Sequence, residues 1–175
     1  MIENKILKQA DDFIFTLFKN AENRSLIFHD YKHTADVVKA SEEIGKESGL
    51  DSDQLELVML AAWFHDVGYL DVCKGHELIS AKTAEEFLIQ QNYNPEKIKT
   101  VKESILATQL DVHPKNILEE VICDADVLNV GTNDYLMRSK LLREEMEQIT
   151  GELVDEKEWL EGELNFLNSH KFFTR

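Results

Sequence analysis

Apolar residues recur along most of the chain at steps of three and four residues, which is the spacing of amphipathic helices. Alternation of apolar and β-branched residues, the sign of strands, is missing. Asn94 followed by Pro95 is a typical helix start, because Asn caps a helix and proline suits its first position. The pattern predicts an all-α bundle of seven to nine helices that forms a single domain over residues 1–175. The expected helices cover residues 2–18, 29–46, 53–68, 76–88, 95–107, 114–128, 134–149 and 156–168.

The third of these segments carries a break in its apolar pattern. The stripe runs from Leu55 through Val58 and Ala62, and its next two positions are His65 and Asp66. Burying even a neutral polar group costs roughly 2–7 kcal/mol unless a partner compensates it. A metal ion compensates an adjacent imidazole and carboxylate together. We therefore predict a metal site inside the helical bundle.

Polar residues interrupt apolar helix faces at two more places. His33 precedes an apolar face at helical spacing, and His29 lies one turn earlier on the same face. Asp126 continues an apolar stripe at steps of four residues, and Asp124 is the alternative on that segment. Residues two apart on a helix are separated by about 200° in projection, so only one of these two carboxylates can face a common site. The stripe favours Asp126.

The resulting set contains two imidazoles and two carboxylates, from His33, His65, Asp66 and Asp126. This mixture suits Mn²⁺, Fe²⁺, Co²⁺, Ni²⁺ or Zn²⁺ better than Ca²⁺, with Mg²⁺ as an alternative. Four protein ligands leave an octahedral ion two positions, one for an acidified water and one for a substrate oxygen, which favours hydrolysis of a phosphate ester. A lone buried histidine is usually a hydrogen-bonded core residue. Four such polar residues on separate apolar faces favour the metal instead.

Composition limits the classes of partner. The chain carries 34 acidic and 19 basic residues, a formal net charge of −15, which repels polymeric nucleic acid and anionic membranes, although it also serves solubility alone. A small phosphate ester held by a divalent cation is compatible with this charge. The two cysteines form no CxxC pair. The first residues carry charges throughout without an apolar run of signal-peptide length, and no apolar run approaches the ~20 residues that span a bilayer. We expect a cytoplasmic protein without a membrane or nucleic-acid partner.

The ordered pattern H…HD…D resembles the HD superfamily of metal-dependent phosphohydrolases. Four stretches carry the resemblance within residues 28–131, and the apolar run before HD and the GHExxSA stretch after it make it specific. The resemblance implies an all-α fold and the same four metal ligands. The stretches are residues 28–33 (FHDYKH), 60–69 (LAAWFHDVGY), 75–81 (GHELISA) and 122–128 (ICDADVL).

The resemblance also implies roles for residues around the ligands. His76 would reach a second metal or the substrate phosphate. His29 matches the position that donates a proton to the leaving group in cyclic-nucleotide phosphodiesterases, although Asp30 replaces the Asn usual after it. Asp66 would also orient the attacking water. Glu77 would act as a general base, or it is an ordinary acidic residue in a first helical turn.

Departures from the family pattern disfavour several subclasses of HD protein. Residues 105–109 lack the additional His found in members with two metals, which disfavours a second metal. Tyr69 and Leu70 stand where alarmone hydrolases have a Glu-Asp pair, and the GYP signature of cyclic-di-GMP phosphodiesterases is missing. The sequence is most similar to small stand-alone bacterial HD-domain proteins.

The expected function is divalent-metal-dependent hydrolysis of a small phosphorylated molecule, most simply a nucleotide, with phosphomonoesters and phosphodiesters both open. His29 and His76 would bind that substrate. One alternative is a regulatory module that binds metal and nucleotide with little or no turnover. The other is a purely structural bundle without a metal. The sequence predicts no particular oligomeric state.

Overall fold

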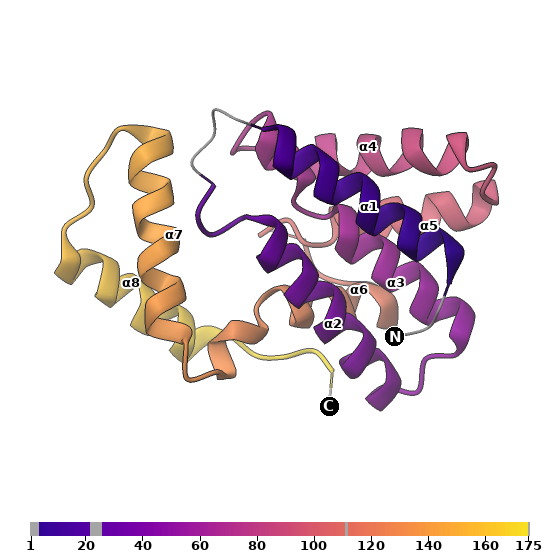
Figure 1. The fold of residues 1–175 in the computed structure, drawn as a ribbon. Coiled ribbons are helices and arrows are strands. Elements are labelled where there is room, and N and C mark those ends of the chain that lie inside the picture. The colour runs from indigo at the N-terminus through magenta and orange to yellow at the C-terminus, as the bar shows by residue number, and fades with distance from the viewer. Residues whose placement is uncertain (1–3, 22–25, 111, 175) are drawn as a thin grey trace.

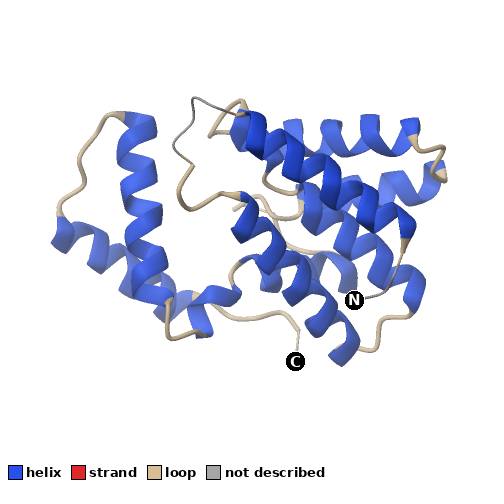
Figure 2. Cartoon of the chain, viewed as in Figure 1, coloured by secondary structure: helices blue, strands red, loops and turns tan. Residues whose placement is uncertain are grey.

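The computed structural model describes residues 4–21, 26–110 and 112–174, and in these ranges it consists of eight α-helices and two 3₁₀ turns without strands (Figure 2). The predicted all-α class and helix number are therefore confirmed. Ile2, expected in the first helix, lies outside the described residues. No helix of the described ranges has both the length and the apolar content needed to cross a bilayer. The elements are α1 (Lys5–Asn20), α2 (Tyr31–Glu47), α3 (Ser52–Phe64), η1 (Val67–Leu70), α4 (His76–Gln90), α5 (Pro95–Leu106), α6 (Ile117–Asp126), η2 (Leu128–Gly131), α7 (Tyr135–Thr150) and α8 (Glu156–Ser169).

Side-chain caps determine where several helices begin. The Asn94 side chain accepts the N–H groups of Glu96 and Lys97, so α5 starts at Pro95 as predicted. Helix α2 starts later than expected, because Asp30 accepts the N–H of His33 at 2.7 Å and is itself extended. The expectation that His29 lies on this helix was therefore wrong.

Helix α3 is the centre of the bundle. Nine of its 13 residues are buried, and it packs against α1, α2, α4, α5 and α6 (Figure 1). Burying a large apolar side chain contributes about 1.5–3 kcal/mol, so this helix is the most firmly held element around the site. The HD dipeptide follows directly after its last residue, Phe64.

The expected helix over residues 53–68 ends earlier, at Phe64, and this boundary was wrong. The chain turns through Asp66 into η1 and then into α4. The turn is tight, because a Cβ at Gly68 would lie 2.1 Å from the carbonyl oxygen of His76. The N–H of Gly68 donates to Ser80 Oγ at 2.9 Å, which joins the turn to α4. His76 is thereby brought close to the HD dipeptide.

The C-terminal helices α7 and α8 lie to one side of the bundle (Figure 1). Two buried carboxylates connect them and the following tail to the rest of the chain. Glu145 of α7 accepts the N–H of Phe28 at 2.7 Å, and Asp124 of α6 accepts the N–H groups of Phe173 and Thr174 at 2.9 and 2.7 Å. Glu145 thus joins α7 to the segment that carries His29, and Asp124 joins the tail to α6.

Candidate metal centre

Four side chains from three helices converge at the ends of α3 and α6. His33 comes from the first turn of α2, His65 and Asp66 follow α3, and Asp126 is the last residue of α6. Each offers one nitrogen or oxygen atom, and these four atoms lie within 4.8 Å of one another. Both imidazole Nε2 atoms are 3.1–3.3 Å from Asp66 Oδ2 and 3.3 Å from Asp126 Oδ1. The four predicted ligands thus form one cluster.

The inward atoms of this cluster are not satisfied by the protein. Nε2 of His33, Nε2 of His65 and Oδ2 of Asp66 are buried and have no hydrogen-bond partner, although they lie at ion-pair distance from one another. Buried polar groups nearly always find a partner, so three such atoms directed at one point indicate a place for a cation. His65 Nδ1 lies 2.8 Å from the carbonyl of Ala62 and donates to it, which leaves the Nε2 lone pair facing the cluster. This donor set fits a divalent transition metal.

Burial and ion pairing shift the pKa values of the four cluster residues in opposite directions. Burial alone lowers the pKa of His33 and His65, but the carboxylates of Asp66 and Asp126 outweigh it and raise both pKa values, that of His65 strongly. Burial likewise raises the pKa of Asp66 and Asp126, but the imidazoles, His65 foremost, hold both well below their usual range. Without a metal, the cluster therefore retains protons on nitrogen and charge on oxygen.

These shifts predict how the stability of the metal-free protein depends on pH. The raised pKa values of His33 and His65 contribute stability below the usual histidine pKa of about 6.5, and this is lost as the pH rises through the raised values. The lowered pKa values of Asp66 and Asp126 contribute stability above the usual aspartate pKa of about 3.9, and this is lost as the pH falls through the lowered values. The free energy of unfolding, measured in urea with a chelator, should peak near pH 5.

Saturating Mn²⁺ should restore the stability lost at alkaline pH, because a cation replaces the protons of the two imidazoles. Equal stability of the metal-free protein at pH 5 and pH 9 would contradict this account of the cluster.

His76 and Glu77 lie beside the cluster rather than in it. His76 is the first residue of α4, and its Nε2 is 3.3 Å from Oδ1 of Asp66, the oxygen not shared with His33 and His65. Its Nδ1 is 2.9 Å from the carbonyl of Cys73, to which it donates. Glu77 lies 3.8 Å from that same Nδ1, on the edge of the ring turned away from Asp66. His76 is thus placed to contact a molecule bound at the cluster. Glu77 lies on the other side of the His76 ring from Asp66.

His29 is held on a second side of the site. Its ring stacks on Tyr69 with a centroid distance of 3.8 Å, and Tyr69 stacks on His76 at the same distance. Its Nδ1 pairs with Glu145 Oε1, and the other Glu145 oxygen accepts the N–H of Phe28 and of His29. Burial alone raises the pKa of Glu145, but the contacts with His29 and the two N–H groups outweigh it and lower that pKa. Glu145 therefore orients His29 as a charged acceptor.

The side chains of Asp124 and Asp126 point in different directions, as their positions on the helix require. Asp126 faces the cluster, whereas the buried Asp124 accepts hydrogen bonds from the N–H groups of Phe173 and Thr174 and from Thr174 Oγ1. The tail that follows α8 is thereby attached to α6.

The same substitution at Asp126 and at Asp124 gives a matched test of which aspartate is the metal ligand. Asp126→Asn should weaken Mn²⁺ binding by at least about 100-fold, since losing a ligand should exceed the 10–100-fold effect of disturbing a ligand's support. Asp124→Asn should leave Mn²⁺ affinity unchanged and lower the free energy of unfolding by about 1–3 kcal/mol, because it weakens charge-assisted bonds to the tail. Titration calorimetry and urea unfolding measure the two effects. If Asp124→Asn instead weakens Mn²⁺ binding and Asp126→Asn does not, Asp124 is the ligand.

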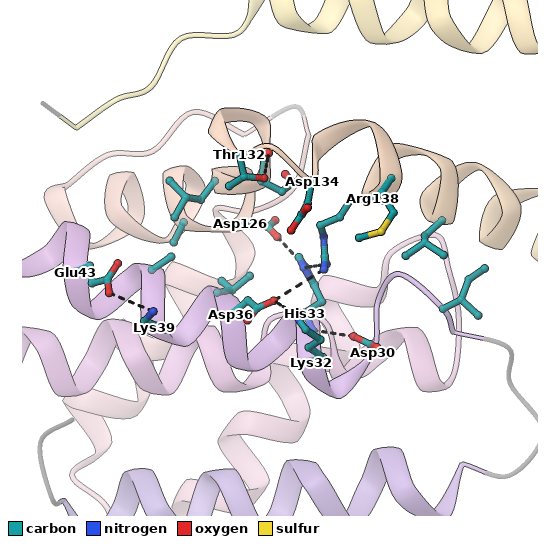
Figure 3. A pocket seen from close by; sticks show the side chains of 18 residues that line it. Asp30, Lys32, His33, Asp36, Lys39, Glu43, Asp126, Thr132, Asp134 and Arg138 are labelled. Atoms are coloured by element: carbon teal, nitrogen blue, oxygen red, sulfur yellow. Dashed lines mark hydrogen bonds and ion pairs between the residues drawn. The ribbon is translucent and has the colours of Figure 1, made fainter.

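A cavity of about 470 Å³ opens beside the cluster, between α2, η2 and α7 (Figure 3). His33 and Asp126 form part of its wall, so a molecule in the cavity would contact the cluster. Apolar side chains cover other parts, and Arg138 of α7 points toward His33. The apolar lining includes Val37, Ala40, Leu128, Met137 and Leu141.

Sequence reasoning missed three residues of this region, namely Tyr69, Arg138 and Glu145. The last two lie on α7 among other charged residues, and their spacing does not differ from that of a solvated helix face. Tyr69 ends one of the stretches that carry the resemblance and stands where alarmone hydrolases have a Glu-Asp pair, but neither observation gives it a role. No local pattern marks any of the three.

A helical bundle with two histidines and two aspartates gathered at the end of its central helix defines a protein of the HD class. The family model described as HD domain matches residues 30–131, and the chain belongs to this family. The resemblance inferred from the sequence is confirmed.

Two known proteins are similar to the chain. An uncharacterized protein of Clostridium beijerinckii (strain ATCC 51743 / NCIMB 8052) is 31% identical over 109 residues, which are 59% of this chain and 68% of that protein. The crystal structure of a predicted HD superfamily hydrolase from an uncultured Thermotogales bacterium matches with a TM-score of 0.64. The match covers 92% of this chain and 86% of that chain at 19% identity, so it shows a shared fold.

Proposed function

We propose that the chain is a divalent-metal-dependent phosphohydrolase that cleaves a phosphate ester of a small molecule, with nucleotides as the expected substrates. The observation that carries the proposal is the set of three buried, unpartnered atoms of His33, His65 and Asp66 that face one point beside a cavity. A divalent cation held there by these residues and Asp126 would supply an acidified water and neutralise charge on the phosphoryl group.

The remaining polar residues have complementary positions. Oδ1 of Asp66 points toward His76 rather than toward the two ligand imidazoles, so this carboxylate can both hold a cation and orient an attacking water. His76 can donate to a phosphoryl oxygen. His29, whose Nδ1 is engaged by Glu145, retains Nε2 for protonation of the leaving oxygen.

The cavity supports a small substrate. Its volume of about 470 Å³ lies within the usual range for sites that bind small molecules, and its lining mixes apolar and polar groups. The net charge of −15 disfavours a polyanionic substrate such as nucleic acid. A nucleotide satisfies both conditions, since it combines one or a few phosphates with a flat organic group.

Release of p-nitrophenol from bis-p-nitrophenyl phosphate in the presence of Mn²⁺ tests the proposal, followed by a panel of nucleotides. His65→Ala should eliminate the Mn²⁺-dependent rate. His113→Ala, which removes an exposed histidine that is not part of the cluster, should leave that rate unchanged. Equal rates in all three proteins, or none in any of them with several metals, would favour the regulatory module over the enzyme.

A further inference from the structure

Arg138 is the basic residue closest to the cluster among those that line the cavity. Its Nη2 lies 3.1 Å from Nδ1 of His33, and its Nη1 is 3.9 Å from Asp36 Oδ2. The guanidinium carbon lies 5.0 Å from the centroid of the Phe28 ring, and only 14% of the side chain is exposed. The guanidinium is thus held at the boundary between the cluster and the cavity (Figure 3).

The contact with His33 is incompatible with a cation on that residue. An arginine guanidinium has donors and no acceptor, so it can bond Nδ1 of His33 only while the imidazole is neutral and carries its one proton on Nε2. A cation at the cluster takes the Nε2 lone pair, and the proton must then be on Nδ1. Two N–H groups would face each other across 3.1 Å. A cation held by the cluster would therefore release the Arg138 guanidinium from His33.

Asp36 is the one carboxylate of the cavity wall within ion-pair distance of the guanidinium, although Asp30, Glu43, Asp126 and Asp134 also line the cavity. The other two basic residues that line the cavity, Lys32 and Lys39, are exposed and pair along α2 with Asp36 and Glu43. Asp36 is the nearest carboxylate to Arg138, at 3.9 Å, and Lys32 already holds its Oδ2 at 2.6 Å. Arg138 is therefore the cation of this wall that an incoming anion can engage.

We propose that Arg138 binds the phosphate group of the substrate, with the organic part of the molecule lying in the cavity between α2 and α7. The inference rests on the proposed function and assigns its substrate subsite. A guanidinium binds two phosphate oxygens through parallel N–H bonds, and the phosphate would then bridge Arg138 and the cation at the cluster. The substrate class is a phosphate ester whose terminal phosphate reaches the cluster.

Binding of inorganic phosphate to the Mn²⁺-loaded protein, measured by titration calorimetry, tests this assignment without turnover. Arg138→Met should weaken phosphate binding roughly 10- to 100-fold, the usual effect of losing charge-assisted hydrogen bonds. It should retain or strengthen Mn²⁺ binding, because the competitor for His33 and a nearby positive charge are both removed. Lys140→Met removes a positive charge from the exposed face of the same helix and should change neither affinity.

Opposite effects on phosphate and Mn²⁺ exclude misfolding as the cause, since misfolding would weaken both. If the methionine variant loses its helical circular dichroism, Arg138→Gln, which also removes the positive charge, provides the phosphate measurement instead. Because glutamine keeps a donor for His33, no gain in Mn²⁺ affinity is expected from that variant. Unchanged phosphate affinity in the folded variant would overturn the assignment, as would an unmodified protein that binds no phosphate. The binding measurements do not depend on the release of p-nitrophenol. Failure of the Arg138 subsite is therefore distinguishable from failure of the phosphohydrolase proposal.

Discussion

Asp66→Asn is expected to abolish both metal binding and hydrolysis. This carboxylate is the shared neighbour of three imidazoles, with His33, His65 and His76 all within 3.3 Å of its oxygens. Asparagine keeps the shape but removes the charge that a divalent cation needs. Because metal catalysis supplies several kcal/mol and each ~1.4 kcal/mol is a factor of ten, kcat should fall by at least about 10³-fold.

Thermal unfolding gives an independent measurement of the same change. A ligand at 100 times its Kd stabilises a folded protein by about 2.7 kcal/mol, so Mn²⁺ should raise the Tm of the unmodified protein and leave that of Asp66→Asn unchanged. Asp53→Asn, at the exposed opposite end of α3, is the matched control and should respond to Mn²⁺ like the unmodified protein. A normal Mn²⁺-induced shift in Asp66→Asn would refute the assignment of this residue as a ligand.

His29→Asn is expected to reduce kcat by about 10²–10³-fold while Mn²⁺ affinity is retained, since proton transfer by a positioned side chain contributes about 10²–10⁴-fold. His29 is stacked on Tyr69 and oriented by Glu145, but it is not one of the four residues that form the cluster. Loss of a general acid should be severe for substrates with an alkoxide leaving group and mild for p-nitrophenolate, which leaves without a proton.

Glu145→Gln should have a smaller effect in the same direction, because Glu145 is a positioning residue that acts through His29. It should also lower the rate more for alkoxide leaving groups than for p-nitrophenolate, which a purely structural role of Glu145 would not do. Glu144→Gln alters the neighbouring, more exposed carboxylate of α7 and serves as the control. An equal loss of rate for good and poor leaving groups in His29→Asn would contradict proton donation by His29.

Local patterns were sufficient for most of the helices. Apolar periodicity located all eight, and the cap at Asn94 gave the start of α5, because a side-chain cap acts within a few residues. The errors at the end of α3 and the start of α2 fell beside the site, and α6 is also shorter than expected, over residues 117–126 instead of 114–128. The end of α3 depends on the contact between Gly68 and the His76 carbonyl, and the start of α2 depends on the bond from His33 to Asp30. Helical periodicity continues through both points and therefore does not mark them.

The sequence by itself determined the all-α class and the group His33, His65, Asp66 and Asp126, because polar residues on apolar helix faces need a common partner wherever the helices meet. Only the tertiary structure decided what surrounds that group. Glu145 reaches His29 and Arg138 reaches His33 across more than 100 residues, and Asp124 holds the tail 49 residues away. A charged residue that is buried by a distant segment has the same local sequence as one in water. Its partner, and hence its role, exists only after the chain has folded.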